Sequence, residues 1–147
     1  MDTRKEKLED FKTAISSTVK SLSNSQKIEV SFGNQNIKDQ TSVKLPDLSR
    51  VGNRLNFDEI RATADSISLN LRFSNKKIFE KHRPKGNISK KLYKIAEKIR
   101  CEKIGINHFK GVKKNIEKFY KKRISELDFK SSEDKIVESF ENFLRIK

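Results

Sequence analysis

Residues 90–115 read KKLYKIAEKIRCEKIGINHFKGVKKN, and this stretch decides the fold. At 100° per residue, four aliphatic side chains share one narrow stripe and predict a core-facing helix: Ile88, Leu92, Ile95 and Ile99. Gly105 predicts the C-cap of this helix, and a second helix is expected to start near Phe109. Glu102 lies beside the apolar stripe, where a carboxylate is costly to desolvate without a partner. The sequence must therefore supply partners for Glu102 and for Arg100, which lies on the opposite side of the helix.

The remaining apolar periodicity predicts four more helices and two short strands. The helices are expected over 4–22, 57–73 and 109–127 and after Ser132. Alternation of Ile28, Val30 and Phe32 with polar residues predicts one strand, and a second is expected over 41–45. Residues 33–36 are typical of a turn, and loops are expected over 46–56 and 74–87. We therefore expect a mainly α fold, with about five helices packed in one domain and a short β-hairpin near residues 28–45.

Composition excludes several classes of protein. The 147 residues contain no apolar run of about 18, so no transmembrane span is predicted. The N-terminal sequence MDTRKEKLEDF is charged and lacks the apolar core of a secretory signal. Cys101 is the single cysteine, which excludes an internal disulfide and fits a reducing, cytoplasmic location.

The net charge of +14 is concentrated in one third of the chain. Between Lys76 and Arg123 there are 18 Lys and Arg residues against 4 Asp and Glu, and the rest of the chain is balanced. One interpretation is a footprint for an anionic partner. The simpler interpretation is a solvated helical surface on which lysine fills exposed positions, and residue types alone favour this one.

No catalytic or metal-binding set is recognisable in the sequence. His82 and His108 are isolated from the spacings typical of metal ligands, so no metal site is predicted. Cys101 is expected to be a packed helix thiol rather than a nucleophile. No Walker A loop is present, since neither Gly105 nor Gly111 precedes a Gly-Lys-Ser/Thr sequence. Residue types alone thus indicate a basic, mainly helical interaction module; a free-standing enzyme lacks any recognisable catalytic set, and a nucleic-acid-binding module remains the alternative.

An ordered series of short motifs between Phe11 and Tyr120 resembles the N-terminal region of the CobT subunit of aerobic cobaltochelatase. The stretch IRATADSISLNLRF fits the family pattern R-x-x-A-D-x-x-A-L at Arg61 and Asp65, although Ser68 stands where the family usually has Ala. The stretch AEKIRCEKIGINHFKGVKKN fits E-Q-x-R-x-E-x-I-G followed by Gly and Asn, with Lys98 in place of Gln. The matching residues in this second stretch are Glu97, Arg100, Glu102, Ile104, Gly105, Gly111 and Asn115.

The resemblance implies a role in cobalamin biosynthesis. The family's complex inserts Co²⁺ into hydrogenobyrinic acid a,c-diamide and uses ATP and Mg²⁺. Its partners would be an AAA+ ATPase subunit and a large corrin-binding subunit, with self-association allowed for. This chain is expected to be a non-catalytic assembly or coupling subunit that holds no cofactor itself. The resemblance also implies a CobT-like domain over 1–127 and a C-terminal helix over 128–147 that leads out of it. The family's von Willebrand A-type domain is absent from this sequence, so we expect either a fragment or a natural short form.

Two sets of site residues follow. We expect Arg61, Asp65, Glu97, Arg100 and Glu102 to form an ion-pair network between the helix over 57–73 and the helix of the opening stretch. We expect the basic window to dock an acidic protein segment rather than nucleic acid. Four lysines flank the motif residues and are the predicted docking positions: Lys90, Lys91, Lys113 and Lys114.

Overall fold

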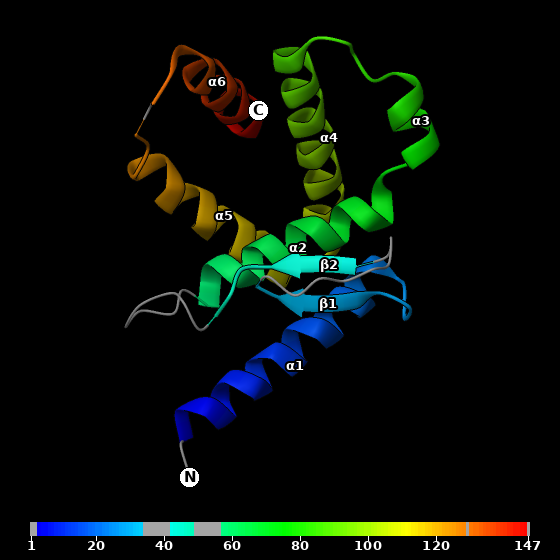
Figure 1. The fold of residues 1–147 in the computed structure, drawn as a ribbon, viewed down its shortest axis with the longest axis vertical. Coiled ribbons are helices and arrows are strands. Elements are labelled where there is room, and N and C mark those ends of the chain that lie inside the picture. The colour runs from blue at the N-terminus through cyan, green and yellow to red at the C-terminus, as the bar shows by residue number, and fades with distance from the viewer. Residues whose placement is uncertain (1–2, 34–41, 49–56, 129, 147) are drawn as a thin grey trace. The chain divides into compact units, whose positions relative to one another are not determined.

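The computed structural model (Figure 1) describes residues 3–33, 42–48, 57–128 and 130–146. The fold is mainly α, as predicted, with six helices and two short strands in these described ranges. The chain forms two compact units, Met1–Arg72 and Phe73–Lys147. The last helix, Ser132–Ile146, packs within the second unit. The expected domain over 1–127 with a C-terminal helix leading out of it stays a prediction. In the described part of the chain, no helix combines the length and the apolar character needed to span a membrane.

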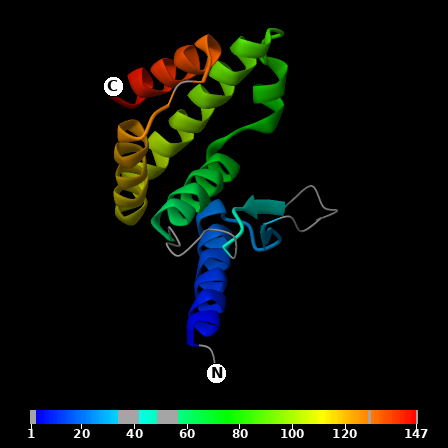
Figure 2. The ribbon, with the colours of Figure 1, turned by 60° about the vertical axis from the view of Figure 1, so that its left-hand side comes forward.

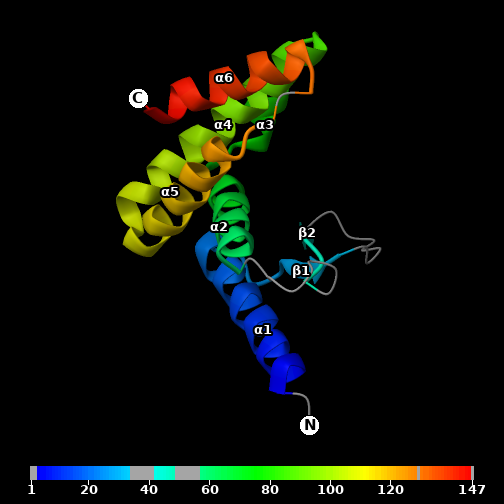
Figure 3. The ribbon, with the colours of Figure 1, turned by 90° about the vertical axis from the view of Figure 1, so that its left-hand side faces the viewer.

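The first unit has an apolar core between two helices and a pair of strands. Its elements are α1 (Thr3–Ser23), β1 (Glu29–Phe32), β2 (Ser42–Leu45) and α2 (Phe57–Phe73), the last of which ends at the boundary between the units. The buried core side chains are Ile15, Val19, Ile28, Val43, Leu45, Leu48, Ile60 and Ala64. Asn24, at φ 57°, lies in the left-handed region and ends α1. Both strands lie to one side of the two helices (Figure 3).

The two strands pair in parallel, so the predicted hairpin is wrong. Val30 faces Val43 and Phe32 faces Leu45 in the register, and the Gly33 N–H donates to the Leu45 carbonyl at 2.9 Å. A hairpin needs only a short turn between its strands. A parallel pair needs a longer connection, because the chain must return from the end of the first strand to the opposite edge of the sheet, where both strands start. Nine residues separate the strands, enough to span about 30 Å when extended. The rest of the predicted turn, residues 34–36, and most of the predicted loop over 46–56 lie outside the described residues.

The second unit is built from α3 (Lys76–Lys81), α4 (Asn87–His108), α5 (Lys110–Ser125) and α6 (Ser132–Ile146). Two of these helices, α5 and α6, pack against α4 (Figure 2). The short helix α3 occupies part of the stretch predicted to be a loop, and it makes six helices in place of about five. Asn75 caps it, since the Asn75 side chain accepts hydrogen bonds from the backbone N–H groups of Lys77 and Ile78.

Gly105 does not cap α4, which corrects the sequence prediction. It is buried within the helix, which continues to His108, where the Phe109 N–H donates to the Gly105 carbonyl at 2.8 Å. In the described ranges, a left-handed φ occurs at Asn24 and Gly33 and at no other residue. Glycine inside a helix costs about 1 kcal/mol relative to alanine, an amount that tertiary packing readily offsets.

The last helix presents its polar side to its own unit. Glu141 is the buried residue of α6, at 4% exposure, whereas Ile136 and Phe143 are 50% and 55% exposed. These two apolar residues are seven positions apart and share a face, while Glu141 and Arg145 lie on the opposite face. The helix lies where the sequence predicts it, but its buried residue is on the polar side, whereas Phe140 and Leu144 are only half-buried.

Candidate functional site

Arg145 of α6 is the centre of a charged cluster in the second unit. One guanidinium nitrogen lies 2.6 Å from a Glu102 carboxylate oxygen, and another lies 2.8 Å from Glu141. Its guanidinium carbon is 3.2 Å from the centroid of the Tyr120 ring, a cation–π arrangement. Side-chain exposure is 12% for Arg145, 5% for Glu141 and 1% for Glu102. The partner that Glu102 needs is therefore an arginine 43 residues away.

Two further cations complete the cluster. Arg123 of α5 pairs with Glu138 at 2.5 Å and lies 3.7 Å from Glu141, so it links α5 to α6. The Lys98 ammonium of α4 donates to the Tyr120 hydroxyl at 2.7 Å. Each helix of the α4–α5–α6 group thus contributes both to the charged cluster and to the contacts between helices.

Burial and neighbouring charges shift the acidities within the cluster. Burial lowers the pKa of Lys98, against the opposing charges of Glu102 and Glu141. Burial also raises the pKa of Tyr120, and the charge of Glu102 adds to the effect. Burial alone would raise the pKa of Glu141, but the hydrogen bond from Arg145 and the charges of Arg145, Lys98 and Arg123 leave it below its ordinary value. Glu141 is therefore anionic at neutral pH despite its burial.

Glu97 and Arg100 form a separate structural clamp on the other side of α4. Arg100 donates two hydrogen bonds of 2.8 Å to the Glu97 carboxylate and a third, of 2.9 Å, to the Phe73 carbonyl. Ser74 donates to Glu97 at 2.7 Å. The hydrogen bond from Arg100 is the main reason that the pKa of Glu97 is lowered. The pair holds the segment before α3 against α4.

Cys101 is packed inside α4, as predicted. Its side chain is buried, and burial together with the charge of Glu97 raises the pKa of the thiol to about 11. A thiol with so high a pKa is a poor nucleophile at neutral pH. In the described part of the chain, no group of three or more His, Cys, Asp or Glu side chains is placed to hold a metal ion.

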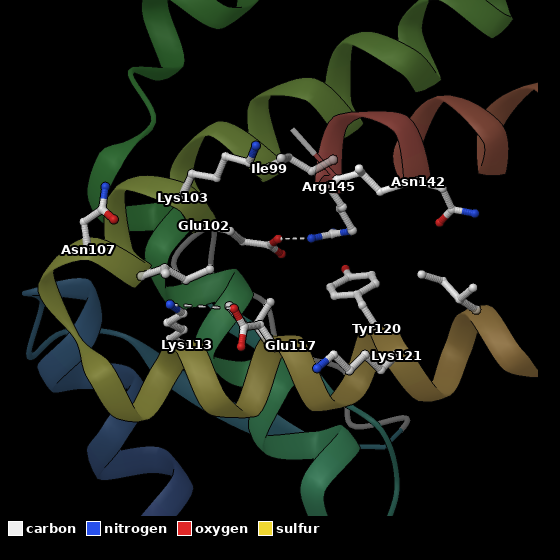
Figure 4. Close-up of a pocket in the computed structure, with 14 residues that line it drawn as sticks. Ile99, Glu102, Lys103, Asn107, Lys113, Glu117, Tyr120, Lys121, Asn142 and Arg145 are labelled. Carbon is white, nitrogen blue, oxygen red and sulfur yellow. Dashed lines mark hydrogen bonds and ion pairs between the residues drawn. The ribbon is translucent and has the colours of Figure 1, made fainter.

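A groove of about 610 Å³ runs beside the charged cluster, between α4, α5 and α6 (Figure 4). Isoleucines form much of its lining: Ile99, Ile106, Ile116, Ile124 and Ile146. Figure 4 shows Arg145 reaching from α6 over the Tyr120 ring toward Glu102. Lys103, Lys113 and Lys121 also border the groove, and all three are exposed. The groove therefore combines an apolar lining with a mostly basic rim.

Comparison with known protein families shows to which family this chain belongs. The sequence model of the family described as Cobalamin biosynthesis protein CobT matches residues 5–146. The chain belongs to the CobT family. No solved structure matches it. CobT membership implies a role in cobalamin biosynthesis. The family match extends beyond the Phe11–Tyr120 stretch that carries the sequence resemblance.

The CobT motif residues fall into different places in the structure. Arg61, over the Phe11 ring at 5.5 Å, and the buried Asp65 belong to the first unit. Glu97, Arg100 and Glu102 belong to the second unit, where Glu97 pairs with Arg100 and Glu102 with Arg145. An ion-pair network joining all five stays a prediction.

Two further CobT motif positions, Gly111 and Asn115, lie on α5. Asn115 is half-buried. Gly111 is exposed, and a Cβ atom added there would meet nothing within 4 Å. Packing within the described part of the chain thus gives no steric reason for glycine at position 111.

The four predicted docking lysines lie on two helices of the second unit. Lys90 and Lys91 are in the second turn of α4, and Lys91 pairs with Glu133 of α6 at 2.5 Å. Lys113 and Lys114 are exposed on α5. Lys113 lies 4.0 Å from Glu117. Their role in docking a partner stays a prediction.

The sequence pattern did not predict the main members of the charged cluster: Lys98, Tyr120, Arg123, Glu138, Glu141 and Arg145. One pattern in the sequence does indicate part of this cluster. Glu138, Glu141 and Arg145 share one face of the last helix at spacings of three and four. They lie opposite Ile136 and Phe143. Because the apolar face of a helix usually packs inward, the sequence pattern predicts that these charged residues are exposed to solvent.

Proposed function

We propose that this chain is a non-catalytic assembly subunit of an ATP-dependent cobaltochelatase that acts in the cytoplasm. The supporting observation is the CobT family match over residues 5–146. In the proposed complex, Co²⁺ and hydrogenobyrinic acid a,c-diamide are substrates, and their chemistry belongs to the large corrin-binding subunit. ATP and Mg²⁺ belong to the AAA+ ATPase subunit. The role of this chain is to link the two.

The charged surface of the second unit supports a docking role. The helix α5 carries six lysines and one arginine against a single glutamate. Complementary charge at the rim of an interface mainly accelerates association and weakens with salt. We place the docking positions at Lys90, Lys91, Lys113 and Lys114.

The test is capture of the ATPase subunit from the same source by the purified chain, at low and at high salt. Reversing the four docking lysines to Glu should reduce capture, most of all at low salt. A matched control reverses four exposed lysines of the first unit, Lys5, Lys7, Lys27 and Lys44, and so makes the same change in net charge. Equal capture by both quadruple variants would contradict the docking positions, and no capture by the wild-type chain would contradict the assembly role.

Calorimetric titration of the isolated chain tests the non-catalytic part of the proposal. Neither ATP with Mg²⁺ nor Co²⁺ alone should bind with micromolar affinity and a defined stoichiometry. The reason is that the sequence holds no Walker A loop. Saturable binding of either ligand at one site per chain would contradict this expectation.

A further inference from the structure

We propose that the groove between α4, α5 and α6 is a binding site for an acidic amphipathic helix of a partner protein. The proposal rests on the proposed function, since it names the kind of segment that a partner subunit would present. It goes further by assigning the site, the conformation and the chemistry of that segment. Three features of the groove carry it: its lining, its length and its rim.

The lining of the groove favours apolar side chains. The polar groups at its floor already have partners within the unit, since Glu102 pairs with Arg145, and Tyr120 accepts from Lys98. A polar ligand would gain few directed hydrogen bonds there. Ile124 and Ile146 are 46% and 86% exposed, so a ligand that covers them removes apolar surface from water.

The length of the groove fits a helix of about three turns. The α5 side of the lining recurs with the period of one helical face: Lys113, Ile116, Glu117, Tyr120, Lys121 and Ile124. The first and the last of these residues are eleven positions apart, which corresponds to about 16 Å along the helix axis. A groove of this form between helices is a common site for an amphipathic helix.

The rim of the groove selects for negative charge on the occupant. Lys103 borders the α4 side, and Lys113 and Lys121 border the α5 side, with Glu117 as the acidic exception. More lysines, Lys110, Lys114 and Lys118, continue the basic surface along α5. A partner helix with an apolar stripe and Asp or Glu on both flanks would match this arrangement.

Nucleic acid fits the same surface less well. Single strands are usually held by exposed aromatic side chains on which the bases stack. Tyr120 is 7% exposed and its ring is covered by Arg145, while the rest of the lining is mainly aliphatic. The basic rim alone would give non-specific phosphate contacts that weaken steeply with salt.

The experiment measures binding of three fluorescent designed peptides to the full chain by anisotropy. The first has a leucine stripe at i, i+4, i+7 and i+11 with Glu on the flanks, the second has Lys on the flanks, and the third keeps Glu but has Ser in place of the leucines. Saturable binding of the first peptide only is expected. Absence of saturable binding by the first peptide, or equal binding of all three, would overturn the proposal, and so would tight binding of a labelled DNA duplex without peptide binding.

Two matched variants locate the peptide. Ile124→Asp changes a groove residue, and Ile78→Asp changes a similarly exposed isoleucine on α3, outside the groove. Ile124→Asp should weaken binding about tenfold or more, and Ile78→Asp should leave it unchanged, with the same circular dichroism and melting temperature for both variants. Equal loss in both would overturn the assignment to the groove. Because the peptides contain no chelatase sequence, failure here leaves the capture of the ATPase subunit unaffected, and failure of that capture leaves this result standing.

Discussion

The helices α1 and α6 are both amphipathic, yet the residues that they bury fully differ in kind. The buried residues of α1 include Ile15 and Val19, which join an apolar core. The buried residue of α6 is Glu141, and its contacts include the ion pairs from Arg145 and Arg123. Apolar burial is non-directional and scales with the area removed from water, whereas a buried ion pair depends on the presence of each partner. The two helices should therefore respond differently to mutation and to pH.

The largest effect should come from removing the centre of the charged cluster. Arg145→Met leaves Glu102 and Glu141 buried without their main cation. Loss of one partner of a buried ion pair costs about 3–5 kcal/mol. Urea denaturation should show a loss of this size, accompanied by faster hydrogen exchange in α6.

A second substitution tests the cause of that loss. Adding Glu102→Gln to Arg145→Met removes one stranded carboxylate and should restore part of the stability. If the double variant is less stable than Arg145→Met, the Glu102 carboxylate is not stranded without Arg145, and the nearby charge of Lys98 is sufficient to stabilise it.

A comparable loss of stability, but one that does not depend on charge, should follow from a substitution in α1. Ile15→Ala removes a core side chain that is 4% exposed, and such truncations cost about 2–5 kcal/mol. No charge changes, so the loss should be the same at low and high salt and at pH 7 and pH 5. A salt-dependent loss would show that the first unit also relies on electrostatic contacts.

Acid should loosen α6 before it affects the first unit's core. The pKa of Glu141 is lower in the folded chain than its ordinary value of 4.5. The stability that this carboxylate contributes is therefore complete above about pH 4.5 and is lost as pH falls through the lower folded pKa. NMR spectra recorded from pH 6 to pH 3 should show the amide resonances of α6 shifting or broadening before those of α1. Simultaneous loss of both helices would contradict the difference in pH sensitivity between α6 and α1.

The smallest effect on stability is expected at the clamp formed by Glu97 and Arg100. The Arg100 side chain is 49% exposed, and exposed ion pairs contribute about 0–1 kcal/mol. Arg100→Ala should therefore lower the free energy of unfolding by about 1 kcal/mol or less, in contrast to Arg145→Met. An equal loss in the two variants would contradict this expectation and would favour the predicted ion-pair network at Arg100.

The sequence predicted the helices well because local periodicity determines them. The boundaries of α2 match the prediction, and those of α1 lie within one residue of it. The end of α4 was wrong because tertiary packing outweighs the propensity of Gly105. The parallel pairing of β1 and β2 was not predictable from the alternation, which is the same in both orientations.

The candidate site was less predictable because it depends on contacts between distant residues. The sequence identified Glu102 as a buried carboxylate that needs a partner, but 43 positions separate it from Arg145. Local patterns identify pairs three or four residues apart, such as Glu97 with Arg100. They carry no information on which face of α6 would meet α4.

The contact between Arg145 and Glu102 also limits how these positions can evolve. Replacing either residue alone leaves a buried charge without its counterpart. Because Glu141 also pairs with Arg145, an apolar alternative must replace all three residues, and replacing a whole buried group of charges by apolar residues of similar size is often neutral. Two acceptable sequences are then separated by unstable intermediates, so neither is easily reached from the other by single substitutions. A library that varies positions 102, 141 and 145 one at a time would find all three intolerant, and only joint randomisation would reveal the alternatives.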